Sequence, residues 1–339
     1  MNATMTLENA KHYPVMLNQI LSIISPQHGG MFIDCTFGGG GYTKAILKFP
    51  GTKVVAIDRD QIAKQHANKV LKEFPDRFKF FQDKFSNLNK ISELNGNPRA
   101  IIFDLGLSSY QIADSQRGFS FKSAGPLNME MGINECSVFD AVNKLDKNDL
   151  AKIIRILGEE RDAKRIANEI IKRRFKKPLQ NSEELVSIIK SVKKNYKKFK
   201  KNPATKTFQA LRIFVNKELT ELVKGLFAAT EILKDGGILA VVNFHSLEDK
   251  IVKSFFKLYS KSNSNPSRYI PKKNKNQNSN LFKSISKKAL RPGEKEILKN
   301  IRSRSAKLRY AVRNRNSFFY SQEISEKFEN YLKIEEMAV

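Results

Sequence analysis

A glycine cluster at the end of an apolar run constrains this fold more than any other feature of the sequence. The segment FIDCTFGGGGY spans residues 32–42, and the run KVVAID (53–58) ends at Asp58. Glycines let a backbone come close to a ligand, and a carboxylate about 20 residues further on accepts hydrogen bonds from both hydroxyls of a ribose. The pattern predicts an α/β sheet that holds an adenosine group at the carboxyl ends of its strands.

Short apolar runs recur along the chain with helical segments between them, at 31–36, 53–58, 78–82, 100–105 and 237–243. Each run is too short for a buried helix, and most are rich in Ile, Val and Phe. They therefore predict a Rossmann-like, mostly parallel sheet. The alternating segment RSAKLRYAVR (304–313) predicts an antiparallel closing strand.

The interval 110–205 has no strand-like alternation and predicts an all-helical insertion. One helical face ends at Gly158, and Asn181 with Glu184 predicts a capping box ahead of another helix. Apolar residues at steps of three and four, from Phe208 to Leu226, predict one helix that leads into the fifth strand.

The predicted organisation therefore has four parts. They are a first sheet part (1–109), the helical insertion (110–205), a second sheet part (206–316) with a mobile basic loop at 261–280, and a C-terminal extension (317–339) without assigned chemistry. The basic segment 193–201 carries two aromatic residues and fits either a solvated loop or direct RNA contact.

The charge of the chain points to a polyanionic partner. The sequence has 61 Lys+Arg against 34 Asp+Glu, a formal net charge of +27, and each phosphate that a cation neutralises favours binding. With 40% hydrophobic residues, the chain is not compositionally disordered. Two cysteines form neither a zinc cluster nor a secreted disulfide scaffold. We find no signal peptide and no apolar run long enough for a bilayer, and we expect a cytoplasmic, reduced protein.

Polar residues end the fourth and fifth runs and are the candidates for catalysis. Asp104 ends IIFD, and Asn243 and His245 follow the fifth run in VVNFHSLED. A carboxylate that ends a parallel strand lies at the edge where ligands bind. Phe85 fits either adenine contact or core packing, and Arg117 either organises its loop or touches phosphate.

Several sequence blocks together resemble the RsmH (MraW) family. From about residue 11 to 313 they include HYPVML (with His12, a weaker active-site candidate), DCTFGGGGY, AIDRD, DLGLSSYQ, RGFSF, GPLNMEM, NPATKTFQALRIFVNKEL and RSRSAKLRYAVR. That family consists of S-adenosylmethionine-dependent methyltransferases that modify N4 of a decoding-centre cytidine in bacterial 16S rRNA.

The resemblance implies a class I methyltransferase fold, S-adenosylmethionine as cofactor, and 16S rRNA in the small ribosomal subunit as partner, with no membrane contact and with homodimer formation left open. It implies cofactor contacts from Gly38, Gly40, Gly41, Tyr42, Asp58, Phe85, Asp104 and Gln111. The sequence departs from the family at Tyr42, Asn128 and Glu130, and we carry no role onto 128–131.

The amine of cytosine is a poor nucleophile, so the enzyme must align it and accept its hydrogens. Asp104, Asn243 and His245 are the candidates for this catalytic role. We expect the methyl group to pass directly from the cofactor to the amine, without a covalent intermediate between enzyme and base. Methylation of cytosine C5 is disfavoured, because that reaction needs a cysteine nucleophile at the rim of the fourth or fifth strand, where neither Cys35 nor Cys136 lies. The alternatives are methylation at another RNA position, including a ribose hydroxyl, and a non-catalytic RNA-binding or ribosome-assembly factor. An NAD-dependent dehydrogenase is the weakest alternative, because Thr43 replaces its third glycine.

Overall fold

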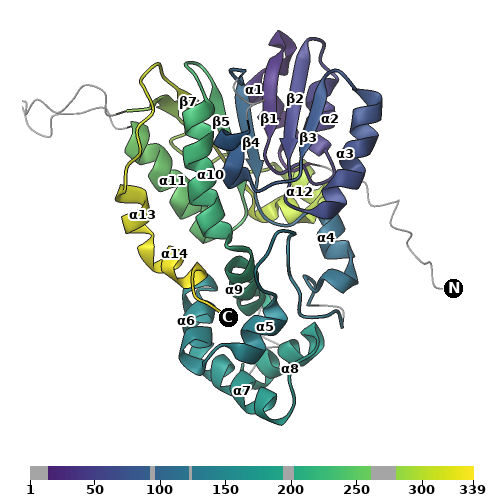
Figure 1. The fold of residues 1–339 in the computed structure, drawn as a ribbon, viewed down its shortest axis with the longest axis vertical. Coiled ribbons are helices and arrows are strands. Elements are labelled where there is room, and N and C mark those ends of the chain that lie inside the picture. Colours follow the sequence, from purple (N-terminus) through teal and green to yellow (C-terminus); the bar gives the residue numbers. More distant parts are fainter. Residues whose placement is uncertain (1–13, 92–95, 122–123, 194–201, 261–279) are drawn as a thin grey trace, which may run out of the picture. The chain divides into compact units, whose positions relative to one another are not determined.

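Two compact units make up the described part of the chain (Figure 1). The computed structural model describes residues 14–91, 96–121, 124–193, 202–260 and 280–339. A sheet unit comprises Lys11–Gly106 and Glu221–Lys327, and a helical unit comprises Leu107–Thr220 and Phe328–Val339. His12, the segment 194–201 and nearly all of the predicted basic loop lie outside the described residues. The division of the chain into the four predicted parts, with their bounds, remains a prediction.

A seven-stranded sheet forms the centre of the sheet unit, in the order β3–β2–β1–β4–β5–β7–β6. The strands are β1 (Gly30–Asp34), β2 (Thr52–Ile57), β3 (Phe78–Phe81), β4 (Ala100–Asp104), β5 (Ile238–Asn243), β6 (Phe282–Ile285) and β7 (Lys307–Arg313). The first five strands pair in parallel, and β7 is antiparallel to both of its neighbours. The predicted parallel sheet and its antiparallel closing strand are confirmed; β6 was not predicted.

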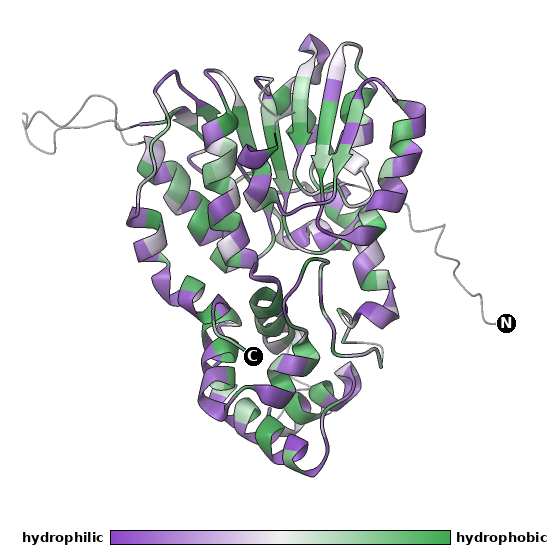
Figure 2. Cartoon of the chain, viewed as in Figure 1, coloured by the Kyte–Doolittle hydropathy of each residue, from purple (hydrophilic) through white to green (hydrophobic). Residues whose placement is uncertain are grey.

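The helices of the sheet unit precede, connect or follow these strands. They are α1 (Leu17–Ile24), η2 (Pro26–His28), α2 (Gly41–Leu47), α3 (Gln61–Glu73), η3 (Phe85–Lys90), most of α10 (Glu218–Ile232), α11 (Ser246–Ser260), α12 (Glu294–Lys299), η7 (Ile301–Ser305) and α13 (Glu323–Lys327). Figure 2 shows that the central strands are hydrophobic along most of their length. This is typical of parallel strands that are buried on both faces.

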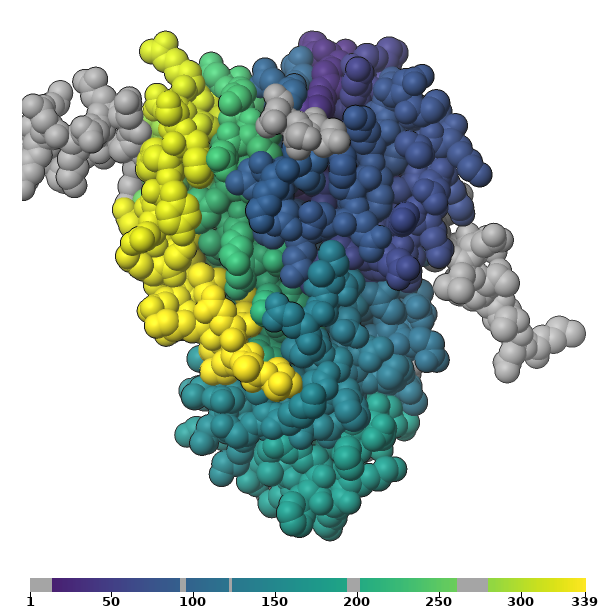
Figure 3. Space-filling view, in the orientation of Figure 1, coloured from purple at the N-terminus to yellow at the C-terminus, as the bar shows by residue number. Residues whose placement is uncertain are grey.

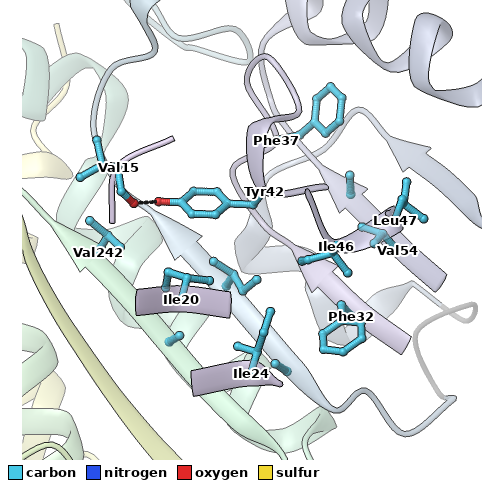
Figure 4. Close-up of a cluster of buried hydrophobic side chains, with 14 of the residues drawn as sticks. Val15, Ile20, Ile24, Phe32, Phe37, Tyr42, Ile46, Leu47, Val54 and Val242 are labelled. Atoms are coloured by element: carbon cyan, nitrogen blue, oxygen red, sulfur yellow. Dashed lines mark hydrogen bonds between the residues drawn. The ribbon is translucent and has the colours of Figure 1, made fainter. Parts of the chain in front are cut away.

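Alternate side chains of each strand point to opposite faces of the sheet. On one face, Phe32, Val54 and Val242 join a buried cluster with Ile20 of α1 and Ile46 of α2 (Figure 4). The cluster holds α1 and α2 against the sheet. It thereby fixes the turn between β1 and α2 that contains the four glycines.

The helical unit contains no strand among its described residues. Its helices are α4 (Ser109–Ala113), η5 (Ser115–Arg117), α5 (Val138–Lys144), α6 (Lys147–Leu157), α7 (Ala163–Lys176), α8 (Ser182–Val192), α9 (Thr205–Asn216) and α14 (Glu329–Glu335), with the first turn of α10. The predicted all-helical character of the insertion agrees with these elements, and α6 ends at Gly158 as expected. Across the described ranges, no helix is long and apolar enough to cross a bilayer.

The single helix predicted between Phe208 and Leu226 is wrong. The structure has two helices there, because Lys217 between them takes a left-handed conformation with φ of 50°. The Asn216 side chain stabilises this break: its oxygen accepts from Met131 N at 2.8 Å, and its amide nitrogen donates to Met129 O at 2.7 Å. The apolar stripe continues across the break, which is why periodicity did not reveal it.

Two local predictions in this unit need correction. Asn181 caps α8 by accepting from Glu184 N at 3.0 Å, but the Glu184 carboxylate accepts from Gln180 N rather than from Asn181 N, so the capping box is incomplete. Lys193, the first residue of the predicted basic segment, is buried and donates to the Glu160 carboxylate at 2.5 Å. It is therefore part of the core and not a surface cation.

The carboxyl-terminal helix of the helical unit caps a helix that lies far away in the sequence. α14 packs on α6 and α9, and Figure 3 shows the end of the chain, in yellow, against teal helices of this unit. The buried carboxylate of Glu335 accepts from Leu219 N at 2.9 Å and from Thr220 N at 2.7 Å. These amides belong to the first turn of α10, where helical amides have no partner within the helix. Burial raises the pKa of Glu335 to about 8.

Candidate cofactor and active site

The glycine loop lies between the end of β1 and the start of α2, and it meets the residue that follows β2. Gly38 N donates a hydrogen bond to Asp58 Oδ2 at 2.7 Å. Gly40 has a φ of 76°, and a Cβ atom there would lie 2.8 Å from the Phe37 ring, so this position excludes larger residues. The predicted loop and the predicted carboxylate therefore share the carboxyl edge of the sheet.

Thr36 connects the first and fourth strands at this edge. Its hydroxyl accepts from Asp104 N at 2.7 Å, and its own amide donates to Asp34 Oδ1 at 3.3 Å. Asp34 also accepts from the Thr43 hydroxyl at 2.7 Å. The sequence analysis did not single out Asp34 or Thr36. The signal was present, because both belong to the DCT triplet that directly precedes the glycine loop.

Three carboxyl groups at this edge are buried, and no positive side chain of the described residues acts strongly on their pKa values. Burial raises the pKa of Asp34 and of Asp58 to about 6, and it raises the pKa of Asp104 to about 8. After burial, the strongest charge that acts on Asp104 is the Asp34 carboxylate, which raises its pKa further. Such a group of acids favours a ligand that carries positive charge.

Unpaired polar atoms lie at the ends of β4 and β5. Asp104 Oδ1 and both polar side-chain atoms of Asn243 are buried and have no hydrogen-bond partner in the described part of the chain. The strand register pairs Asp104 with Val242, so Asn243 is one residue further along the neighbouring strand. A buried polar atom without a partner costs about 1–3 kcal/mol, which a bound ligand with matching donors and acceptors would recover.

His245 directly precedes helix α11 and lies beside Glu248 of its first turn. Glu248 Oε2 accepts from Phe244 N at 2.8 Å and from His245 N at 3.2 Å, as the acid of a capping box does. The His245 imidazole lies on the same carboxyl group, with Nε2 at 3.1 Å from Oε1. The sequence HSLE carried this signal, because a glutamate three residues after a helix cap is its signature.

Two aromatic candidates have different surroundings. Tyr42 is buried in the cluster of Figure 4, and its hydroxyl donates to Val15 O, so only its main chain is free to meet a ligand. The Phe85 ring packs edge-on against Phe103, with ring centroids 5.1 Å apart, beside Gly225 of α10. A contact of Phe85 with adenine remains a prediction.

Gln111 and Arg117 belong to the helical unit. Gln111 forms the capping box of α4 with Ser108, in which Ser108 N donates to Gln111 Oε1 at 2.8 Å. Arg117 donates to Glu130 O at 2.6 Å and lies over the Phe119 ring, so it organises its own loop. The predicted role of Gln111 in cofactor binding remains a prediction.

The sheet and its edge together define a class of protein. A glycine loop after β1, an acid after β2 and an acid that ends β4 form the site of an α/β enzyme for a nucleoside cofactor. The carboxyl cluster fits a cofactor with a positive centre, as a sulfonium has, better than it fits an anionic dinucleotide.

Comparison with known sequences identifies the family. A model of the MraW methylase family matches residues 9–314, and the chain belongs to this family. It is similar to two proteins named ribosomal RNA small subunit methyltransferase H. The one from Parvibaculum lavamentivorans is 42% identical, covering 89% of each chain, and the one from Ehrlichia canis is 44% identical, covering 88% of this chain and 98% of the relative.

Among solved structures, an rRNA methylase from Streptococcus thermophilus aligns with a TM-score of 0.38 at 12% identity, covering 87% of this chain and 95% of that one. The resemblance found in the sequence motifs is confirmed by the family match. The protein is a methylase, and S-adenosylmethionine is its methyl donor.

Proposed function

We propose that the protein methylates the exocyclic N4 amine of a cytidine in the decoding centre of 16S rRNA. The single observation that carries this proposal is the set of buried, unpaired acceptors at the ends of β4 and β5, Asp104 Oδ1 and Asn243 Oδ1. An exocyclic amine presents two N–H donors and needs two acceptors. A ribose hydroxyl has only one hydrogen and would leave one of the two oxygens unpaired.

The chemistry of the base explains what these residues do. The lone pair of the cytosine amine is delocalised into the ring, so the amine must be oriented before it can react. When bound, S-adenosylmethionine supplies a methyl group that is already activated by the positive charge on sulfur. Asp104 and Asn243 accept the amine hydrogens and hold the nitrogen in place, and the Asn243 amide can also donate to a ring acceptor.

The two cysteines support direct transfer without a covalent intermediate. Cys35 directly follows β1 and is buried, and burial raises the pKa of its thiol well above the usual value. Burial also raises the pKa of the Cys136 thiol. Thiols that remain protonated are poor nucleophiles, so neither group suits attack on a pyrimidine ring.

His245 has two roles that remain distinct proposals. As the cap of α11 beside Glu248, it fixes the turn that follows Asn243. As a catalytic residue, it would take the proton that the amine loses. Because both of its ring nitrogens already face groups of Glu248, the geometry supports the positioning role more strongly.

The choice of substrate class rests on charge and on the relatives. A net charge of +27 favours a polyanion, and the relatives at 42% and 44% identity are named as ribosomal RNA small subunit methyltransferases. The resemblance of the sequence motifs to the RsmH (MraW) family supports our choice of the N4 amine and of the decoding centre. We propose the cytoplasm as the compartment, where that RNA is found.

Nucleoside mass spectrometry of 16S rRNA tests this function. RNA from cells with and without the protein should differ in N4-methylated cytidine. Purified protein with labelled S-adenosylmethionine should transfer the labelled methyl group to small subunits from cells that lack the protein. A difference only in a ribose-methylated nucleoside would contradict the assigned atom. Binding to RNA without any transfer of label would favour an assembly factor.

A further inference from the structure

The carboxyl-terminal end of helix α7 (labelled in Figure 1) presents a phenylalanine that almost nothing covers. Phe175 is 93% exposed, the highest value among the large apolar side chains described. It stands within KRRFKK (172–177), between Arg173 and Lys176. A lone exposed apolar residue is ordinary, but an exposed aromatic ring within a run of cations is typical of surfaces that bind single-stranded nucleic acid.

The helix itself does not explain this side chain. The buried face of α7 runs through Ala163, Ile166, Ala167 and Ile170, and its next position is Arg174, whose guanidinium donates to Val142 O at 2.8 Å. Phe175 lies next to this face and not on it. Cations in the last turn stabilise the negative end of the helix dipole, which accounts for basic residues but not for the ring.

The cations around the ring are free to meet a ligand. Arg173, Lys176 and Lys177 are exposed, and their side chains have no salt bridge in the described ranges. Lys172 lies 3.9 Å from Glu169, at the outer limit of an ion pair. Exposed cations beside an exposed ring are the elements that proteins use to bind phosphates and stack a base of single-stranded RNA.

We propose that Phe175 stacks on an unpaired base of the RNA substrate while Arg173, Lys176 and Lys177 contact its phosphates. This inference rests on the proposed function, because it takes RNA as the substrate. A second copy of the chain is a poor occupant, since both would carry a charge of +27. An anionic membrane needs an apolar stripe along a helix, and this turn offers one ring.

A tryptophan substitution tests the contact directly, because the chain has no tryptophan. In Phe175→Trp, the new side chain is the only indole of this chain. After the emission of small subunits alone is subtracted, its fluorescence should be quenched when unmodified small subunits are added. Leu71→Trp is the matched control: Leu71 is 44% exposed on helix α3 of the sheet unit, and its emission should not change. Vesicles with anionic lipids form a third arm and should leave both emissions unchanged.

Kinetics separate stacking from simple hydrophobic contact. Phe175→Ala and Phe175→Leu should raise the KM for small subunits by about 5- to 150-fold, the range for loss of one stacked base, with kcat and the Kd for S-adenosylmethionine unchanged. Phe175→Tyr keeps the ring and should keep the KM. Removing the three cations together should flatten the dependence of binding on salt concentration.

The outcomes distinguish the inference from the function on which it rests. If Phe175→Trp methylates small subunits but shows no quenching, or if Phe175→Leu matches the unmodified protein, the inference is wrong and the function stands. Quenching by vesicles and not by RNA overturns it in favour of a membrane contact. If the unmodified protein transfers no methyl group to small subunits, the proposed function itself fails.

Discussion

The edge of the sheet and the end of α7 carry opposite charge in opposite surroundings. At the sheet edge, acids are buried, and burial raises the pKa of Asp104 to about 8. At the end of α7, cations are exposed, and solvent screens them at little cost in stability. Buried acids with raised pKa values favour a bound ligand that carries positive charge, whereas an exposed run of cations favours a long polyanion that binds by many weak contacts.

The sharpest test of the acidic edge is Asp104→Asn. This change keeps the shape of the side chain but removes its negative charge, and we expect a loss of at least about 100-fold in the single-turnover rate of methyl transfer. Stability should hold or rise, because a buried, unbalanced carboxylate is removed. Asp146→Asn, at the exposed cap of α6, is the control and should leave the rate unchanged. A variant at Asp104 with a normal rate would exclude this residue from the reaction.

His245 allows the two roles proposed for it to be separated. Asparagine is a good helix cap without an imidazole. If His245 only positions the turn, His245→Asn should keep most of the rate and His245→Ala should lose about 10- to 100-fold. Equal losses in both variants, with cofactor binding retained, would instead identify the imidazole as the proton acceptor.

Cofactor affinity should depend on pH because of the same buried acids. The pKa values of these acids in the folded protein lie above the usual value for Asp. Between about pH 4 and 8 the folded, ligand-free protein therefore binds more protons than the unfolded chain. Because of this difference, the acids lower the free energy of unfolding as pH rises. A positive ligand requires the charged acids and displaces these protons. The Kd for S-adenosylmethionine should fall by about 3- to 10-fold from pH 6.5 to 8.

Calorimetry in buffers of different ionisation enthalpy would count the protons released on binding. In Asp104→Asn both the proton release above pH 7 and the slope of affinity against pH should diminish. An affinity that does not change with pH would mean that the acids do not face the positive centre of the ligand.

The smallest expected effect concerns the packing beneath the edge. A Cβ at Gly225 would lie 2.5 Å from the Phe85 ring, so Gly225→Ala must displace that ring. We expect a loss of about 1–3 kcal/mol in the free energy of unfolding, measured with denaturant, and a cofactor Kd raised a few-fold. Gly293→Ala is the control, since a Cβ there meets no atom within 4 Å. An unchanged Kd in Gly225→Ala would place Phe85 in the core alone.

The features that the sequence predicted correctly are those that repeat or that need unusual residues. Short continuous apolar runs rich in Ile, Val and Phe predicted the parallel strands, and alternation in 304–313 predicted the closing strand. The four glycines with Asp58 predicted the turn where they meet. The break at Lys217 was missed because it depends on a backbone angle and on hydrogen bonds of Asn216 to a distant loop. β6 was missed because an edge strand of four residues has little periodicity to detect.

The candidate site was predictable in its residue types and not in its energetics. The strand ends indicated Asp104 and Asn243, but only the structure showed that Asp104 Oδ1 and both polar side-chain atoms of Asn243 lack partners among the described residues. Asp34 and Thr36 looked like ordinary residues beside a glycine loop, although Thr36 accepts from the Asp104 amide and the Asp34 carboxylate raises the pKa of Asp104. Burial and neighbouring charge arise from the packing of several elements, and a local pattern does not contain them.

The link from Glu335 to the first turn of α10 has a consequence for synthesis on the ribosome. Thr220 and Glu335 are 115 positions apart. At roughly 5–20 residues per second, the cap is made about 6–23 s after the turn that it completes. During that delay the amides of Leu219 and Thr220 must bond to water, so the helical unit emerges unfinished and closes only when its last helix has been translated.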